Sequence, residues 1–178
     1  MRWEELFDDL EGQVEHAVRQ DLAAEVADRT RREQATVSLA DRARAARGPL
    51  TWSLRDGSTL VGSVHGAGPG WFLLTSDRGA QVLLAADAVV AVRGLPGWSA
   101  PPLGAVAARR TFLVALRALG DAGVRVRVVT ATGTHGGRLG RVGADHLDLV
   151  PGDGPDVGVG AEAVTVPFGA VLAVWEVP

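Results

Sequence analysis

The sequence predicts a mainly β protein of the α+β class, in which a long N-terminal helix precedes two strongly bent, five-stranded antiparallel barrels, each preceded by a short helix. Three observations lead to this prediction. Residues 2–32 contain Gly12 as their only glycine and no proline, short apolar runs separated by glycine turns follow, and those runs occur twice. The predicted parts are a helical arm at 1–36, barrel 1 at 37–95, a proline-rich linker at 96–104 and barrel 2 at 105–178.

Apolar residues of the arm recur in steps of three and four, which predicts an amphipathic helix. A helix of about thirty residues is about 45 Å long, more than one small barrel covers. We therefore expect its apolar stripe to meet the second barrel or a second chain, and a homodimer joined through this arm is one prediction. A solvated helix with one buried stripe is the alternative. The large residues of the stripe are Trp3, Phe7, Leu10, Val14, Val18, Leu22 and Val26.

Each predicted barrel starts with a short helix. Residues 37–47 form the first, with Ser38 as N-cap and Gly48-Pro49 as the stop signal, and residues 105–119 form the second. Between 48 and 95 the apolar runs are short and separated by turns such as that at 55–58. Five short strands in this space predict a small antiparallel barrel. The predicted strands span 50–54, 60–64, 71–75, 82–85 and 89–93.

The second half of the chain repeats the first. Residues 62–74 align without a gap with residues 137–149, and residues 82–95 align without a gap with residues 164–177. The main difference is a longer loop, rich in Gly and Asp, at 151–163. Two copies of a helix followed by five strands are therefore predicted. In the second block, Val82, Ala88, Val89, Ala91 and Val92 align with identical residues at Val164, Ala170, Val171, Ala173 and Val174.

Short motifs in both copies resemble those of the Sm-like barrel found in Sm, LSm and Hfq proteins. The resemblance covers residues 37–95 and 105–177, and it implies a helix followed by five bent strands in each copy. A long helix before two such copies is also similar to a group of proteins from GC-rich actinobacteria, some of them described as transcriptional regulators. The resemblance is carried by Gly57 with residues 62–64, Gly133 with residues 137–139, and residues 92–94, from which residues 174–176 depart.

The resemblance also directs attention to RNA, because Sm rings hold bases with an Asp and an Asn of the third loop and an Arg of the second motif. Here Gly68 and Gly143 stand where that Asp would be, and the chain contains no Asn. We therefore expect no specific binding to uridine-rich RNA. Sequence-independent contact with phosphates is the alternative for nucleic acid, and a charged sheet face beside acidic residues is the structural alternative. The candidate contact residues are Arg93, Arg125, Arg127, Arg138 and Arg141.

Composition excludes several kinds of chemistry. The chain has 178 residues, a net charge of −3 and no Cys or Lys, which excludes thiolate nucleophiles, P-loop lysines and Schiff bases. The four histidines show no metal-ligand spacing, so we expect no catalytic residue, cofactor or metal site. The longest apolar stretch, 82–92, is too short to span a membrane, and we expect no signal peptide at the start of the chain. A cytoplasmic protein is predicted.

These observations favour a non-enzymatic adaptor or scaffold that acts through protein–protein interaction and self-association, with a protein partner still to be identified. The alternative is a nucleic-acid-associated regulator that uses Arg93 and the arginines of the second copy. Binding that weakens with salt would distinguish the regulator from the adaptor.

Overall fold

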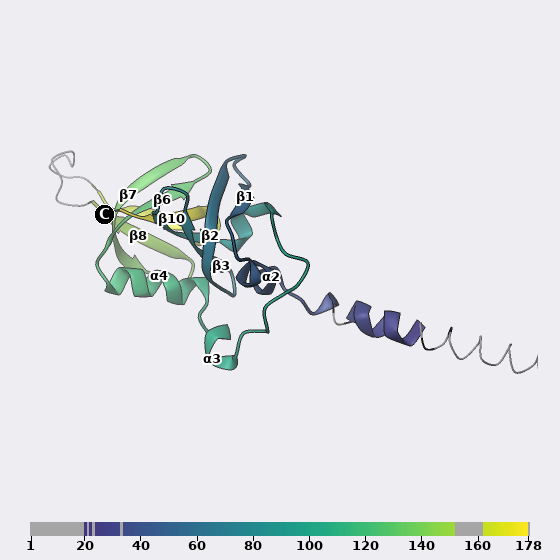
Figure 1. Ribbon diagram of the computed structural model, residues 1–178. Coiled ribbons are helices and arrows are strands. Elements are labelled where there is room, and N and C mark those ends of the chain that lie inside the picture. Colours follow the sequence, from purple (N-terminus) through teal and green to yellow (C-terminus); the bar gives the residue numbers. More distant parts are fainter. Residues whose placement is uncertain (1–19, 21, 23, 33, 152–161, 178) are drawn as a thin grey trace, which may run out of the picture. The chain divides into compact units, whose positions relative to one another are not determined.

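The computed structural model describes residues 20, 22, 24–32, 34–151 and 162–177. The chain divides into two compact units, residues 1–38 and residues 39–178. The sheet and the helices that pack on it all belong to the second unit (Figure 1).

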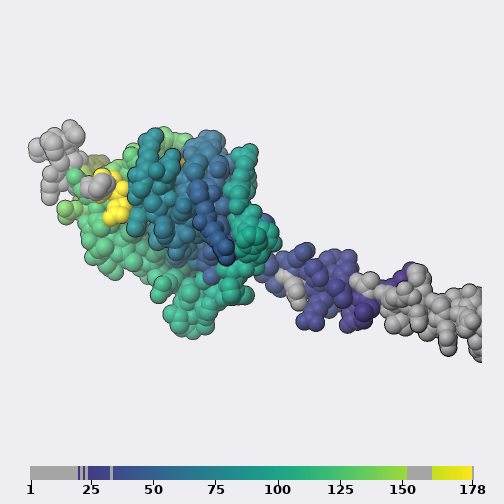
Figure 2. All heavy atoms as spheres, in the orientation of Figure 1, coloured from purple at the N-terminus to yellow at the C-terminus, as the bar shows by residue number. Residues whose placement is uncertain are grey.

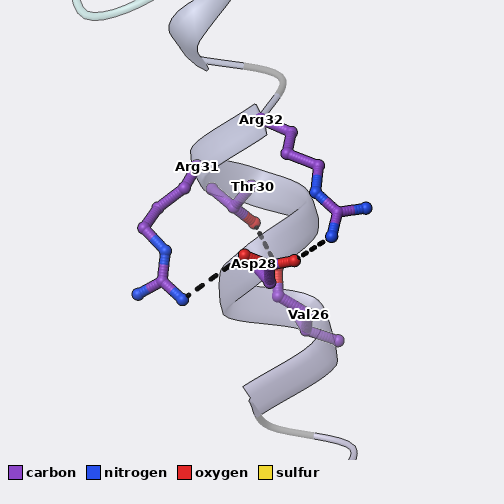
Figure 3. A network of polar contacts seen from close by, with 5 residues as sticks. All are labelled: Val26, Asp28, Thr30, Arg31 and Arg32. Carbon is purple, nitrogen blue, oxygen red and sulfur yellow. Dashed lines mark hydrogen bonds and ion pairs between the residues drawn. The ribbon is translucent and has the colours of Figure 1, made fainter.

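The described part of the N-terminal unit is helical at 20, 22, 24–32 and 34–35. Asp28 forms ion pairs with Arg31, at 3.7 Å, and with Arg32, while the Thr30 hydroxyl donates a hydrogen bond to the Val26 carbonyl at 2.8 Å (Figure 3). Pairs three and four residues apart stabilise an exposed helix by about 0.2–0.5 kcal/mol each. Local side-chain pairs therefore support this helical segment.

The prediction of a long N-terminal helix is wrong, while contact of its apolar stripe with a second copy stays a prediction. All helices in the described residues are short, and Leu22 and Val26 are 63% and 59% exposed. Helical spacing places apolar residues on one face, but burial also requires a surface that covers that face. The other five residues of the stripe, Trp3, Phe7, Leu10, Val14 and Val18, lie outside the described residues.

The described residues of the second unit contain ten strands in two groups of five. The first group consists of β1 (Leu50–Leu54), β2 (Thr59–Gly68), β3 (Trp71–Ser76), β4 (Gln81–Ala85) and β5 (Val89–Arg93). The second group consists of β6 (Arg125–Thr130), β7 (Gly133–Val142), β8 (His146–Val150), β9 (Val164–Pro167) and β10 (Val171–Glu176). Short 3₁₀ turns, η1 (Ala86–Ala88) and η2 (Phe168–Ala170), precede β5 and β10.

All ten strands form one antiparallel sheet, in the order β5-β1-β2-β3-β4-β10-β6-β7-β8-β9. The prediction of two separate five-stranded barrels is therefore wrong. The groups join because β4 pairs with β10, in a register centred on Leu83 and Val174. Apolar periodicity identifies a strand and its buried face, but it does not tell which strand edges meet.

Pairing follows the same order within each group: the last strand lies beside the first, and the second, third and fourth follow. Each group has a register shift between its second and third strands, after Val64 and after Leu139. Each also has one between its first and last strands, where Val90 and Leu172 are the extra residues. Such bulges bend a strand and strengthen its twist.

Glycine is required where the second strand of each group approaches the third. A Cβ on Gly62 would lie 2.8 Å from the Thr75 carbonyl oxygen, and a Cβ on Gly137 would lie 2.5 Å from that of Val150. Backbone atoms cannot swing aside as a side chain can, so any larger residue would push the two strands apart.

Helix α2 (Leu39–Ala45) packs beside β2, and α4 (Phe112–Asp121) packs beside β7 (Figure 1). The single helix predicted at 105–119 is divided into α3 (Ala105–Ala108) and α4. Thr111 separates them, because its side chain accepts a hydrogen bond from the Val114 amide as the N-cap of α4. The proline-rich segment is fastened to α2, since the Arg42 guanidinium donates to the Pro96 carbonyl at 2.8 Å.

Two apolar clusters form the core. One surrounds Trp52 and Phe72, whose ring centroids lie 4.7 Å apart, and the other surrounds Leu116. The junction strands exchange side chains between them: Leu83 of β4 belongs to the second cluster, and Leu172 of β10 belongs to the first. The two groups therefore share their hydrophobic stabilisation as well as their backbone hydrogen bonds. Figure 2 shows the first group, blue to teal, packed against the second, green to yellow.

Candidate functional site

The two ends of the sheet are candidate interaction surfaces of the second unit. In the described part of the chain, β5 and β9 each pair with a strand on one side only. An edge strand presents unpaired N–H and C=O groups to any chain that can align with it. In chain order, β5 is the fifth strand of its group, as β10 is, and β9 is the fourth strand of its group, as β4 is. The two free edges are therefore of the same kinds that meet at the β4–β10 junction.

Strand β5 is more exposed than β10, although the two strands have similar sequences. The apolar runs at 89–92 of β5 and 171–174 of β10 are nearly identical in sequence. The run in β10 is fully buried, whereas in β5 only Val89 and Val92 are half-buried and Val90 is 69% exposed. Leu172, the corresponding bulge residue of β10, is 0% exposed because it lies in the first apolar cluster. A strand with the composition of an internal strand thus lies at a sheet edge.

The opposite edge is apolar in part. Val164 of β9 is 39% exposed, while Val166 is buried. These edges were not predicted as a candidate site, although the sequence contains a signal for them. Continuous apolar runs at 82–85, 89–92 and 171–174 are typical of strands covered on both faces. The first and last of these runs are covered, and the middle run is not.

Three of the predicted arginines lie together. Arg125 and Arg138 are directly opposite each other on β6 and β7, and Arg127 lies two residues further along β6. All three are exposed, and within the described part of the chain none forms an ion pair. Like charges directly opposite each other on a sheet are unfavourable, so this pair concentrates positive charge at one place without a stabilising cross-strand partner.

Arg127 is held in place by an aromatic ring. Its guanidinium carbon lies 5.4 Å from the centre of the Trp175 ring, on the neighbouring strand β10. A contact of this kind at an exposed site contributes about 0.5–1 kcal/mol. Both residues line an open groove of about 790 Å³ that runs from the β1–β2 turn to β7 and β10.

The remaining two arginines are not part of this group. Arg141 lies beyond the bulge of β7, past Leu139. Arg93 lies on β5 opposite Thr51, and five strands separate β5 from β6 in the sheet. The structure thus brings together Arg125, Arg127 and Arg138, and leaves Arg93 on the free edge.

Aromatic rings lie against Gly68 and Gly143. A Cβ on Gly68 would lie 2.6 Å from Nε1 of Trp71, and a Cβ on Gly143 would lie 2.5 Å from Cε1 of His146. An Asp at either position would therefore displace a ring, which gives a physical reason for glycine there.

His146 is anchored by its neighbour, since its Nδ1 lies 2.8 Å from a carboxylate oxygen of Asp145. Hydrogen bonding to His146 lowers the pKa of Asp145 below its usual value.

The described residues contain no group of three metal-ligating side chains. Within those residues, too, no helix combines the length and apolar character needed to cross a bilayer.

Comparison with family models, curated proteins and solved structures finds no match for the chain. The sheet edges and the arginine group are the features of the described residues that bear on function.

Proposed function

We propose that the protein is a non-enzymatic scaffold that self-associates through the free edges of its sheet, with β5 of one copy pairing with β9 of the next. In this proposal the two strand groups are two copies of one Sm-like unit joined in a single sheet, and the protein acts in the cytoplasm. The shared order of pairing and the paired bulges at Val90 and Leu172 support the first point.

The observation that carries this proposal is the contrast between β5 and β10. The internal junction joins a fourth strand, β4, to a last strand, β10, and buries Leu172. The free edges are again a fourth strand, β9, and a last strand, β5, and Val90 is left exposed. A second copy that repeats the junction covers Val90 and pairs one free edge of each copy; further copies, or closure of a ring, pair the edges that remain.

Such a contact joins two different surfaces, so it builds either a closed ring or an open filament. Full burial of a valine side chain contributes about 1.5–3 kcal/mol, and Val90 is 69% exposed, so covering it contributes about 1–2 kcal/mol. Backbone hydrogen bonds along the edges add to that contribution.

Light scattering on the full chain across micromolar concentrations tests the proposal. We expect oligomers in the wild type and a shift toward the monomer in Val90→Glu, because a buried, unpaired carboxylate is strongly unfavourable. Val114→Glu is the matched control, since Val114 is also an exposed valine but lies on α4, away from both edges. A monomeric wild type, or oligomers that Val90→Glu leaves intact, would contradict the proposal.

The same experiment distinguishes edge pairing from association through the N-terminal helix. A Leu22→Glu/Val26→Glu variant changes exposed apolar residues of that helix. If this variant dissociates while Val90→Glu remains associated, the N-terminal helix is the interface.

Electrostatic binding of nucleic acid is a second candidate, favoured by the unpaired Arg125 and Arg138. Fluorescence anisotropy with a short oligonucleotide tests it. Binding that falls steeply with salt and is lost in Arg125→Ala/Arg138→Ala, but not in Arg78→Ala, supports this role. If Arg125→Ala/Arg138→Ala binds the oligonucleotide as tightly as Arg78→Ala does, Arg125 and Arg138 take no part in the binding.

A further inference from the structure

A cleft on the α4 side of the β4–β10 junction lies outside the edges used for self-association. It is bounded by α4 and by strands β3, β4, β6 and β10, and its volume is about 280 Å³. Small-molecule sites usually have volumes of about 300–1,000 Å³, so this cleft lies just below that range and has room for a small ligand only.

The walls of the cleft are apolar. Trp71 of β3, Leu83 of β4 and Val174 of β10 form the sheet side. Ala115 and Ala118 face them from α4, and their single methyl groups leave the space open. The walls are held in place, because Leu83 and Val174 belong to the second apolar cluster and Trp71 packs against it. The indole N–H of Trp71 also donates to the Arg110 carbonyl at 2.5 Å, which fixes the orientation of the ring.

One end of the cleft is polar. Gln81 and Glu176 line it there, on the adjacent strands β4 and β10, just beyond the registered pair Val82–Trp175. Glu176 is the one charged residue among those that line the cleft. Its side chain is exposed and forms no ion pair with any described residue. The cleft therefore combines an apolar interior with a single carboxylate at its rim.

We propose that this cleft binds a small amphipathic cation, whose apolar body lies between α4 and the sheet and whose ammonium group lies at Glu176. Apolar contact supplies most of the affinity in a site of this kind, and the few polar groups determine orientation and selectivity. The carboxylate favours a cation over a neutral or anionic molecule of the same shape. The Gln81 side chain accepts a hydrogen bond from the same ammonium group.

Three probes that share one apolar body and differ in their head group test this proposal: 4-phenylbutylamine, 4-phenylbutanol and 4-phenylbutyrate. Chemical-shift titration of the full chain at neutral pH measures their affinities and locates the perturbed residues. We expect the amine to bind up to about fivefold more tightly than the alcohol, which is the range of an exposed ion pair, and the carboxylate to bind most weakly. The largest shifts should occur at Ala115 and Leu83.

Variants separate the two parts of the site. Glu176→Gln should abolish the preference for the amine while the alcohol binds as before. Ala118→Leu should weaken all three probes at least about tenfold, because the larger side chain occupies the cleft. Leucine is a good helix former and Ala118 is exposed, so α4 should persist, and circular dichroism verifies this. Val114→Leu, on the same helix but outside the cleft, is the matched control.

Absence of binding in the wild type would overturn the proposal, as would equal affinity for the amine and the carboxylate. Binding that Ala118→Leu leaves unchanged would place the probes elsewhere and would also overturn it. Because none of these variants lies on β5 or β9, their results are independent of the self-association proposal.

Discussion

Leu172 offers the most informative test of the junction between the two strand groups. It is the bulge residue of β10, it is 0% exposed, and it lies in the apolar cluster of the first group. Leu172→Ala removes the larger part of a side chain that joins the two groups. Val90→Ala is the matched comparison, because Val90 is the corresponding bulge residue of β5 and is 69% exposed.

The expected magnitude follows from burial. Truncating a fully buried leucine to alanine lowers the free energy of unfolding by about 2–5 kcal/mol, since both transfer energy and cavity formation contribute. In a protein of this size, about 1 kcal/mol changes the midpoint of thermal unfolding by about 2–4 °C, so we expect a decrease of about 4–20 °C. Val90→Ala should change the free energy of unfolding by less than about 0.5 kcal/mol in the monomer.

Urea denaturation, followed by tryptophan fluorescence and circular dichroism at low protein concentration, measures both free energies. Leu172→Met keeps the volume and should cost less than about 1.5 kcal/mol, which controls for any special sensitivity of this position. Equal effects of Leu172→Ala and Val90→Ala would refute the reasoning, because they would show that β10 is no more covered than β5.

Two further predictions concern single sites. Gly137→Ala should destabilise the protein by about 1–3 kcal/mol in urea denaturation, because its Cβ would lie 2.5 Å from the Val150 carbonyl oxygen. Gly133→Ala is the control, since a Cβ on Gly133 meets nothing within 4 Å, and equal stability of the two variants would contradict the prediction. Asp145 should titrate below its usual pKa of 3.8 in carboxyl-carbon NMR, and His146→Ala should raise that pKa. Since the folded-state pKa is the lower one, the pair stabilises the fold above the unfolded pKa and loses this effect as the pH falls through the folded value.

The sequence predicts the strands of this protein well and their assembly poorly. All five strands predicted in the first half are present within a few residues, because alternating apolar positions and glycine turns are local signals. The pairing of β4 with β10 is not a local property. It depends on which strand edges meet and on which distant residues cover the two faces of those strands. The break between α3 and α4 at Thr111 was not predicted. Thr111 acts as an N-cap only through its hydrogen bond to the Val114 amide, and most of the surrounding residues favour a continuous helix.

In the candidate site, too, the local features were predicted and the long-range arrangement was not. The period of two correctly places Arg125 and Arg127 on one face of β6, and strand pairing adds Arg138 beside them. The distance of Arg93 from that group follows from sheet order, which the sequence does not encode locally. The exposure of Val90 could not be predicted either, because its strand has the composition of a buried one.

Disulfide cross-linking between copies tests the central claim of edge pairing most directly. The chain contains no cysteine, so a Val92→Cys/Thr165→Cys variant has one thiol on each free edge. In the proposed register Val92 lies opposite Thr165, as Val174 lies opposite Leu83 at the internal junction. Mild oxidation should then yield a ladder of linked copies, or one closed oligomer, on a non-reducing gel, whereas each single-cysteine variant can yield no species larger than a dimer. A double variant that remains monomeric under conditions in which free thiols are consumed would contradict the account.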